Sequence, residues 1–159
     1  MDSNAKEAYE IAVRLLARRE HSRHELRGKL RLRGVHSREI ETVIEKLSES
    51  GLQSDDRFIE NSIRSQLRKG HGPLKIRAYL LNRGIQYSKI SKHLSNSDDY
   101  WFKRALESDA KCRVRNQMSE DNASNHESLQ VRARYLTNRG YPANVISLVL
   151  SSPINRTNN

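Results

Sequence analysis

A three-fold internal repeat constrains the fold of this chain more than any other feature of the sequence. An arginine followed by a glycine closes each copy, and the second glycine follows the first by 50 residues and the third follows the second by 56. Self-similarity of this kind predicts small units of the same supersecondary structure stacked in a row. The matching residues are Leu26, Leu30, Arg33, Gly34 and Val35 in the first copy, Ile76, Leu80, Arg83, Gly84 and Ile85 in the second, and Leu136, Arg139, Gly140 and Tyr141 in the third.

Each glycine is predicted to end a helix. The apolar residues before it are four apart, which places them on one helical face. Glycine is favoured just past a helix end because it adopts the left-handed conformation without steric cost. Ser37, Ser88 and Pro142 follow the three glycines and are suited to starting another helix. Each copy therefore contains a helix, a sharp turn and a second helix.

A further amphipathic segment precedes each of these pairs, so we expect three helices per repeat. The predicted fold is all-α, with three tandem three-helix repeats of the helix-turn-helix type in an elongated curved array. The repeats are predicted at residues 1–50, 51–97 and 98–154. The apolar residues of the first helices are Ala8, Ile11, Ala12, Leu15 and Leu16, then Phe58, Ile59, Ile63 and Leu67, then Trp101, Phe102, Ala105 and Leu106.

Local signals mark several helix boundaries. Ser22 and Glu25 form a capping-box pattern, and Gly72 with Pro73 is typical of a helix start. We expect Asp98 and Asp99 to cap the first helix of the third repeat.

Polar residues predict the irregular parts of the chain. Residues 116–128 are expected to form a long mobile loop inside the third repeat, which accounts for its longer spacing. The ends, residues 1–4 and the tail 155–159, are expected to be frayed.

The charge of the chain is strongly positive and unevenly distributed. The formal net charge is +10, with 35% hydrophobic and 30% charged residues, which favours thin helical units with much solvated surface. Residues 1–60 carry equal numbers of basic and acidic side chains, so the excess lies in residues 61–159. Residues 61–97 contain no acidic residue at all. Such a segment favours a phosphate-rich or acidic partner over an ordinary solvated face.

Two groups of basic residues are candidates for partner or DNA contact. Arg23, Arg27 and Arg31 are four apart and form a stripe on one helix, although a solvated helix face is an equally good interpretation. The second group lies around the acid-free segment and is the better candidate. It comprises Arg64, Arg68, Lys69, Lys75 and Arg77.

The arginines before the three glycines are interpreted as structural. Arg33 and Arg83 fall near the predicted core face, where the arginine stem covers apolar surface and its charge stabilises a helix C-terminus. We expect the same of Arg139.

Other conspicuous residues do not form a recognisable site. The segment from Lys69 to Pro73 lacks the spacing of a phosphate-binding loop and is interpreted as a turn between helices. His21 and His24 have no companion cluster of metal ligands. We therefore expect no metal, no cofactor and no catalytic site.

The cysteine and the aromatic cluster are interpreted as packing residues. Cys112, the one cysteine, lacks a paired base. Tyr100, Trp101 and Phe102 open a helix, where aromatic residues more often anchor a core than stack nucleic acid bases.

The sequence is that expected of a soluble cytoplasmic protein. A single cysteine excludes an internal disulfide, and the N-terminus lacks the apolar core of a signal peptide. The late apolar run at residues 145–150 is too short to cross a bilayer. We expect no membrane partner and a monomer.

Nearly the whole chain, roughly residues 8–150, resembles the RecX family of recombination regulators. The resemblance rests on an ordered series of residues in the first two repeats. These are Leu15, Leu16, Ala17, Arg18, Arg19, Glu20, Ser22, Glu25, Leu26, Lys29, Leu30 and Gly34, then Leu52, Asp55, Asp56, Arg57, Phe58, Ile63, Arg64, Lys69, Gly70, Gly72, Pro73, Lys75, Ile76, Leu80, Arg83, Gly84 and Ile85.

The resemblance implies a modulator, usually an inhibitor, of the RecA recombinase that binds along the nucleoprotein filament and limits its assembly, ATP turnover and strand exchange. A RecA-type filament and DNA, contacted without sequence preference, are the implied partners. The third repeat departs most from the pattern, since Arg132 stands where Leu26 and Ile76 stand in the other copies.

Two other classes of function remain as alternatives. A capped helix, a glycine turn and another helix also describe an independent helix-turn-helix DNA-binding protein, which would prefer particular duplex sequences. An enzyme is the least supported class, because no catalytic constellation is present.

Overall fold

The computed structural model describes residues 3–154, with side chains from residue 4, and all of the regular structure in that range is α-helical. This confirms the predicted all-α fold. The first helices are α1 (Ser3–Leu16), α2 (Arg23–Arg31), α3 (Ser37–Glu49), α4 (Asp55–Arg68) and α5 (Pro73–Leu81). They are followed by α6 (Tyr87–His93), α7 (Asp98–Arg115), α8 (His126–Arg139) and α9 (Ala143–Ser151).

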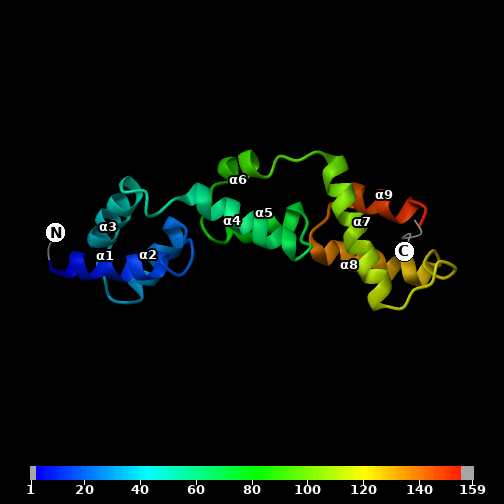
Figure 1. Cartoon of the computed structure of the whole chain (residues 1–159), viewed down its shortest axis with the longest axis horizontal. Coiled ribbons are helices and arrows are strands. Elements are labelled where there is room, and N and C mark those ends of the chain that lie inside the picture. The colour runs from blue at the N-terminus through cyan, green and yellow to red at the C-terminus, as the bar shows by residue number, and fades with distance from the viewer. Residues whose placement is uncertain (1–2, 155–159) are drawn as a thin grey trace. The chain divides into compact units, whose positions relative to one another are not determined.

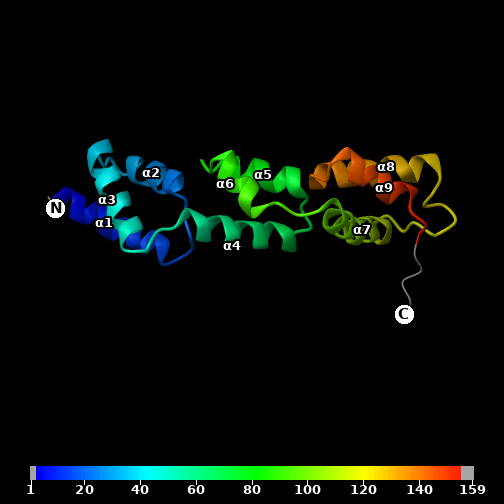
Figure 2. The same ribbon diagram turned by 90° about the horizontal axis from the view of Figure 1, so that it is seen from above.

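The described residues form two compact units, and each contains one closely packed group of three helices. The first unit comprises residues 3–64 and 79–93, and the second comprises residues 65–78 and 94–154, so α4 and α5 contribute to both. In the first unit α1, α2 and α3 pack against one another (Figure 1). In the second unit α7, α8 and α9 lie side by side in both views (Figures 1 and 2). The division into repeats at residues 1–50, 51–97 and 98–154 stays a prediction.

The core of the first unit is made by one face each of α1, α2 and α3. Leu26 and Leu30 of α2 meet the apolar face of α3, and all of these side chains are buried. Ala8 and Ala12 are the buried residues of α1 in this cluster, and their small side chains let α1 approach closely. The residues contributed by α3 are Ile40, Val43, Ile44 and Leu47.

The three repeated glycines have the same turn geometry. Gly34, Gly84 and Gly140 have φ angles of 77°, 73° and 88°, in the left-handed region. After each glycine, the next backbone N–H donates to the carbonyl of a buried leucine at 3.2 Å, which closes the helix end. The pairs are Val35 with Leu30, Ile85 with Leu80, and Tyr141 with Leu136. The prediction that a helix ends at each of the three glycines is confirmed.

Of the helix starts predicted at Ser22, at Pro73 and at Asp98 with Asp99, the first two are correct and the third is wrong. Ser22 accepts a hydrogen bond from the Glu25 N–H, and the Glu25 side chain accepts from the Ser22 N–H, so the capping box of α2 is present. The helix α5 begins at Pro73 as expected. At α7, however, Ser97 caps the helix and accepts from the Tyr100 N–H. Asp98 and Asp99 lie in the first turn, where they face the helix dipole but do not cap it.

The predicted loop of residues 116–128 is too long. The helix α8 begins at His126, and Asn125 caps it by accepting from the Ser128 N–H. Ser128 is therefore inside a helix and buried. The terminal prediction also changes, because residues 3 and 4 belong to α1. Residues 1–2 and 155–159 lie outside the described part of the chain.

A buried ion pair replaces part of the apolar core in the second unit. Arg132 and Asp109 have side chains 2% and 3% exposed, and two hydrogen bonds of 2.8 and 3.0 Å join them. A third hydrogen bond, 2.9 Å long, runs from Arg132 to the carbonyl of Ala123 in the loop before α8. Arg113 also donates to Asp109. The departure from the repeat pattern at Arg132 is thus compensated by a carboxylate on α7 and by the loop.

The end of α5 meets the start of α2 in the first unit. The Ser22 hydroxyl donates to the carbonyl of Arg83 at 2.8 Å. A Cβ added at Gly84 would clash with the side chain of His24. Glycine is therefore required at position 84 both for the positive φ and for the close approach of α2.

The end of α8 meets the start of α5 in the same manner in the second unit. The N–H of Gly72 donates to the carbonyl of Arg139 at 2.7 Å, and the N–H of Leu74 donates to the carbonyl of Gly140 at 3.0 Å. A Cβ at Gly140 would clash with Lys75. Free carbonyls at the end of α8 thus accept hydrogen bonds from free N–H groups at the start of α5.

We predict that Gly84→Ala destabilises the protein much more than Gly51→Ala. Gly51 has the same φ of 73° but open space around its Cβ position, so its change carries only the backbone cost of about 1–2 kcal/mol. Gly84→Ala adds overpacking against His24, which costs about another 1–3 kcal/mol. Urea unfolding of both variants measures the difference, and equal losses would show that the α5–α2 contact is not tight.

We also predict that Asp109→Asn lowers the free energy of unfolding by about 3–5 kcal/mol, because Arg132 then keeps a buried charge without its counter-ion. The control is Asp99→Asn, which removes the exposed pair of Asp99 with Lys103 and should leave the unfolding midpoint almost unchanged. A small effect at Asp109 would contradict a dry ion pair.

Candidate partner-binding surface

The predicted basic stripe of α2 is partly neutralised by α3. Arg27 makes a two-fold hydrogen-bonded pair with Glu41, at 2.6 and 2.7 Å. The hydrogen bond from Arg27, followed by the positive charges of Arg27, Arg23 and Arg31, holds the pKa of Glu41 below its usual value. Arg31 is exposed and Arg23 is half-buried. The stripe is present, but its central residue, Arg27, is paired with Glu41 of α3.

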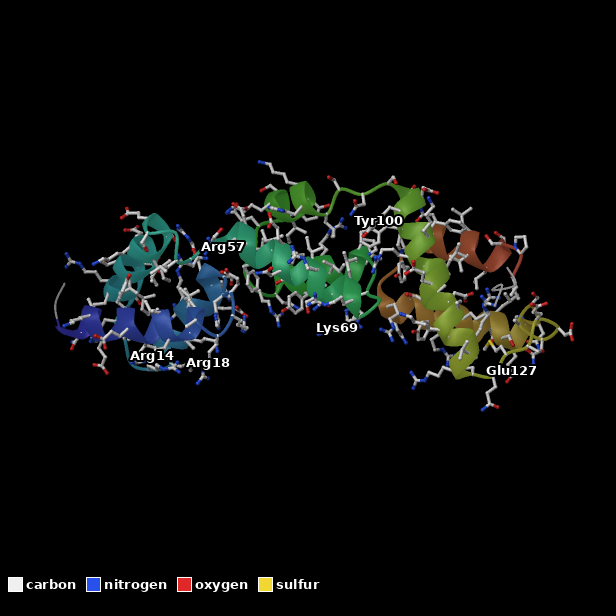
Figure 3. All side chains as sticks on the ribbon, viewed as in Figure 1. Arg14, Arg18, Arg57, Lys69, Tyr100 and Glu127 are labelled. Carbon is white, nitrogen blue, oxygen red and sulfur yellow. The ribbon has the colours of Figure 1, made fainter. Side chains whose placement is uncertain are left out.

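The end of α4 presents cations without counter-charge. Arg64, Arg68 and Lys69 are exposed, and Lys69 lies where α4 gives way to the next turn (Figure 3). Arg64 and Arg68 are four residues apart on α4 and hence on one face. Across residues 4–154, none of these three cations pairs with an acidic side chain. All three are exposed members of the predicted second group.

The two remaining candidates, on α5, are less free to bind a partner. The Lys75 ammonium donates to the carbonyl of Asn138 at 3.1 Å, so it also stabilises the C-terminal end of α8. Arg77 is half-buried. Both stay candidates for partner contact.

Side chains from α7, α8 and the turn after α8 hold the end of α4 in place. The last carbonyls of α4 and of its turn, at Leu67, Lys69 and Gly70, all accept side-chain hydrogen bonds. This network fixes the backbone that bears Lys69. No sequence signal predicts this network, because contacts to backbone carbonyls leave no sequence motif. The donors are Arg104, Ser108, Arg139 and Tyr141.

A cluster of cations surrounds His71 in the second unit. Burial lowers the pKa of His71 first, and the charges of Lys75, Arg139 and Lys69 lower it further. The His71 Nδ1 lies 2.6 Å from the Gln66 side-chain oxygen. Arg139 therefore lies beside His71 together with Lys69 and Lys75, two of the predicted candidates for partner contact. Arg139 itself comes from α8 and was interpreted from the sequence as structural.

The structural interpretation of the arginines before the glycines is confirmed for Arg33 and Arg83. Arg33 donates to the carbonyl of Lys29 at 2.9 Å, and Arg83 donates to that of Tyr79 at 3.3 Å. Arg83 also stacks on the Tyr79 ring, 3.5 Å from its centroid. Each charge thus stabilises its own helix end. Arg139 differs, since it bonds to the end of α4.

Cys112 and the aromatic residues at the start of α7 contribute to packing. Cys112 is fully buried, and burial and then Asp109 raise the pKa of its thiol, which agrees with a packing role. Trp101 is buried as a core anchor, whereas Tyr100 and Phe102 are half-buried.

In the part of the chain that the structure describes, no three or more His, Cys, Asp or Glu side chains form a group suited to a metal ion. No helix in that part is both long and apolar enough to span a membrane.

The fold and the surface define a helical protein built of small three-helix domains, with a basic face at the end of α4. Residues 8–47 match the first three-helix domain of RecX, and residues 54–94 match the second. The chain belongs to the RecX family.

Two relatives agree with this assignment, and a solved structure agrees with the fold. The chain is 36% identical to the Regulatory protein RecX of Legionella pneumophila over 142 residues, which cover 89% of this chain and 91% of the relative. It is also 36% identical to the Regulatory protein RecX of Pseudomonas putida, covering 88% and 86%. The crystal structure of RecX from Lactobacillus salivarius superposes with a TM-score of 0.80 at 20% identity, covering 94% of this chain and 96% of that one, and so supports the fold.

We predict that the pKa of His71 lies below 6.5 and rises when Lys69 and Lys75 are both replaced by Gln, because two of its three repelling cations are removed. NMR titration of the imidazole measures it. Since the unfolded chain binds the proton more readily, His71 should lower stability as the pH falls below 6.5. The matched pair Lys111→Gln and Arg134→Gln should leave this pKa unchanged, and an equal shift in both double variants would contradict the cluster.

Proposed function

We propose that this protein regulates a RecA-type recombinase by binding along its nucleoprotein filament and inhibiting filament assembly, ATP hydrolysis and strand exchange. The observation that carries the proposal is membership of the RecX family across about nine tenths of the chain, together with relatives named regulatory proteins. The basic surface at the end of α4 supports the same proposal.

Unpaired cations suit a filament that contains DNA. Arg64, Arg68 and Lys69 are exposed and have no acidic partner among the described side chains, so they keep the charge needed for phosphate contact. Cations that contact phosphates release counterions, which gives affinity without sequence preference. The contact that we propose is therefore non-specific and assists docking on the recombinase.

Regulation of this kind needs no chemistry from the bound protein. A ligand shifts a conformational equilibrium by its differential affinity for the two states. A helical surface that binds one arrangement of recombinase protomers better than another would slow growth or ATP turnover of the filament. The network that fixes the end of α4 supports such a role, because a rigid surface discriminates better between two arrangements.

The direct test is DNA-dependent ATP hydrolysis and strand exchange by a RecA-type recombinase, with and without this protein. We expect both rates to fall as the protein is added. No change at a several-fold molar excess over the recombinase would contradict the proposal.

We predict that replacing Arg64, Arg68 and Lys69 together by Gln weakens binding to preformed filaments at low salt. The slope of log affinity against log salt should fall by about 1 for each phosphate-binding cation that the substitutions remove. Fluorescence anisotropy at several salt concentrations measures both, and circular dichroism checks that helical content is unchanged.

The matched control removes three other exposed cations, Lys111, Arg115 and Arg134, by the same substitution. Equal weakening by both triple variants would show that net charge alone matters and would refute the surface assignment. Sequence-preferring binding of the wild-type protein to naked duplex would instead favour the helix-turn-helix alternative.

A further inference from the structure

Three arginines of the first unit gather around one hollow, although they come from two helices. The hollow has a volume of about 280 Å³ and is lined by Arg14 and Arg18 at the end of α1, by Arg33 at the end of α2, and by Ile11 and Leu15. All three arginines are exposed, and Figure 3 shows Arg14 and Arg18 near each other along this end of α1. None of them belongs to the basic groups predicted from the sequence. We refer to this site as the arginine hollow.

The spacing along α1 brings four of the lining residues to one face. Ile11, Arg14, Leu15 and Arg18 follow the i, i+3, i+4 and i+7 pattern of a helix. The N–H of Arg18 donates to the carbonyl of Leu15 at 3.2 Å, so the backbone keeps a helical turn beyond the end of α1. Ile11 and Leu15 are half-buried and pack against the core of the first unit. Core packing therefore fixes the apolar part of the lining, and the two arginines stand beside it.

The charges of the arginine hollow are not neutralised by ion pairs. Across residues 4–154, none of its three arginines pairs with an acidic side chain. Arg33 uses one N–H donor for the carbonyl of Lys29, and a guanidinium has several more. Arg14 and Arg18 donate no side-chain hydrogen bond to any described residue. The hollow therefore presents three positive charges with free donors.

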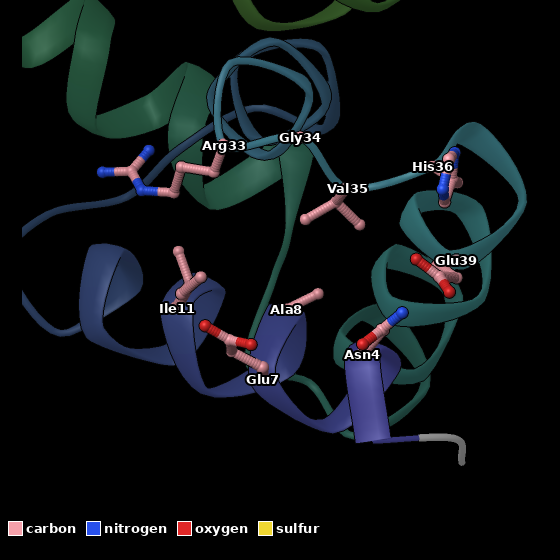
Figure 4. Close-up of a pocket in the computed structure, with 9 residues that line it drawn as sticks. All are labelled: Asn4, Glu7, Ala8, Ile11, Arg33, Gly34, Val35, His36 and Glu39. Atoms are coloured by element: carbon pink, nitrogen blue, oxygen red, sulfur yellow. The ribbon is translucent and has the colours of Figure 1, made fainter.

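Acidic residues lie near the arginine hollow but do not line it. Arg33 also borders a neighbouring hollow of about 220 Å³, whose lining includes Glu7 and Glu39 (Figure 4). In Figure 4 the Arg33 side chain extends away from Glu39. Glu10 lies one turn before Arg14 on α1, but it is not part of the lining and forms no ion pair with that arginine. Positive charge is thus concentrated on the side that the three arginines share.

We propose that the arginine hollow binds the phosphate backbone of a nucleic acid strand, with Arg14, Arg18 and Arg33 as the contacting cations. Guanidinium groups suit this ligand because their paired N–H donors match two phosphate oxygens. Phosphates follow one another along a strand, so neighbouring arginines can contact successive phosphates without reading the sequence. The proposal rests on the function proposed above only for the source of the DNA, which is the recombinase filament. It adds a contact in the first unit to the one proposed at the end of α4.

An acidic protein surface fits the arginine hollow less well. Protein interfaces have an apolar or aromatic anchor near their centre. The hollow offers only Ile11 and Leu15, and both already pack against the core. Interfaces with nucleic acid are more polar and much more positively charged, which is the composition of this lining. The residues therefore favour phosphates over the carboxylates of a protein.

The test measures binding of the full-length protein to a labelled single-stranded oligonucleotide without recombinase, by fluorescence anisotropy at several salt concentrations. We expect Arg14→Gln with Arg18→Gln to weaken binding at low salt by about ten-fold or more, because two phosphate contacts are lost. The slope of log affinity against log salt should fall by about 2, or about 1 for each contact. Arg33 is left in place because it also stabilises the end of α2.

The matched control is Lys6→Gln with Arg38→Gln. Both are exposed cations of the first unit that do not line the arginine hollow, and neither forms an ion pair with a described side chain. This variant removes the same charge and should bind nearly like the wild type. Equal weakening by the two Gln variants would overturn the site, because net charge alone would then explain the binding.

A conservative variant separates charge from structure. Arg14→Lys with Arg18→Lys keeps both positive charges, so its salt slope should equal that of the wild type. A slope that falls as far as in the Gln variant would overturn the assignment of the phosphate contacts to these charges. Circular dichroism checks that helical content is the same in all variants.

A labelled peptide of glutamate residues tests the carboxylate alternative. Peptide binding that requires Arg14 and Arg18, with oligonucleotide binding unchanged in their Gln variant, would overturn the phosphate assignment in favour of an acidic protein. A wild-type protein that does not bind the oligonucleotide at low salt would also overturn it, even if this protein still inhibits the recombinase. Oligonucleotide binding through these arginines without any effect on the recombinase would support the site and contradict only the proposed function.

Discussion

The contact between a glycine-ended helix and the start of another helix is the constraint on which the architecture depends. A helix end leaves carbonyls without donors, and a helix start leaves N–H groups without acceptors. At Arg83 and Arg139 these needs are met together, through Ser22 in one case and Gly72 in the other. The approach is close enough that only glycine fits, so backbone geometry and packing both select the same residue.

The buried pair of Arg132 and Asp109 gives the group of α7, α8 and α9 a different kind of core from the group of α1, α2 and α3. In the first unit, Leu26 fills the place that corresponds to Arg132 and packs with other apolar side chains. In the second unit, the charge of Arg132 is neutralised by Asp109, while the carbonyl of Ala123 accepts a further hydrogen bond. Because a buried pair gains less free energy than good apolar packing, its value lies in fixing where the loop before α8 must lie.

Sequence reasoning predicted what depends on neighbours in the chain and missed what depends on distant ones. The glycine turns and the Ser22–Glu25 capping box were predictable because each involves residues within a few positions. Three contacts could not be predicted, since tertiary packing alone brings their residues together. They are the pair of Arg27 with α3, the pair of Arg132 with α7, and the place of Arg139 beside His71. The prediction of the cap of α7 was wrong for a different reason, because Ser97 and Asp98 are adjacent and both suit the N-cap position.

The helix-end contacts also bear on how such a chain can change in length over evolution. Each contact asks only for a glycine on one side and a small or hydroxyl-bearing cap on the other, so a duplicated segment brings a compatible joint with it. A modular joint of this kind lets gene duplication or deletion add or remove a unit without redesigning the cores on either side.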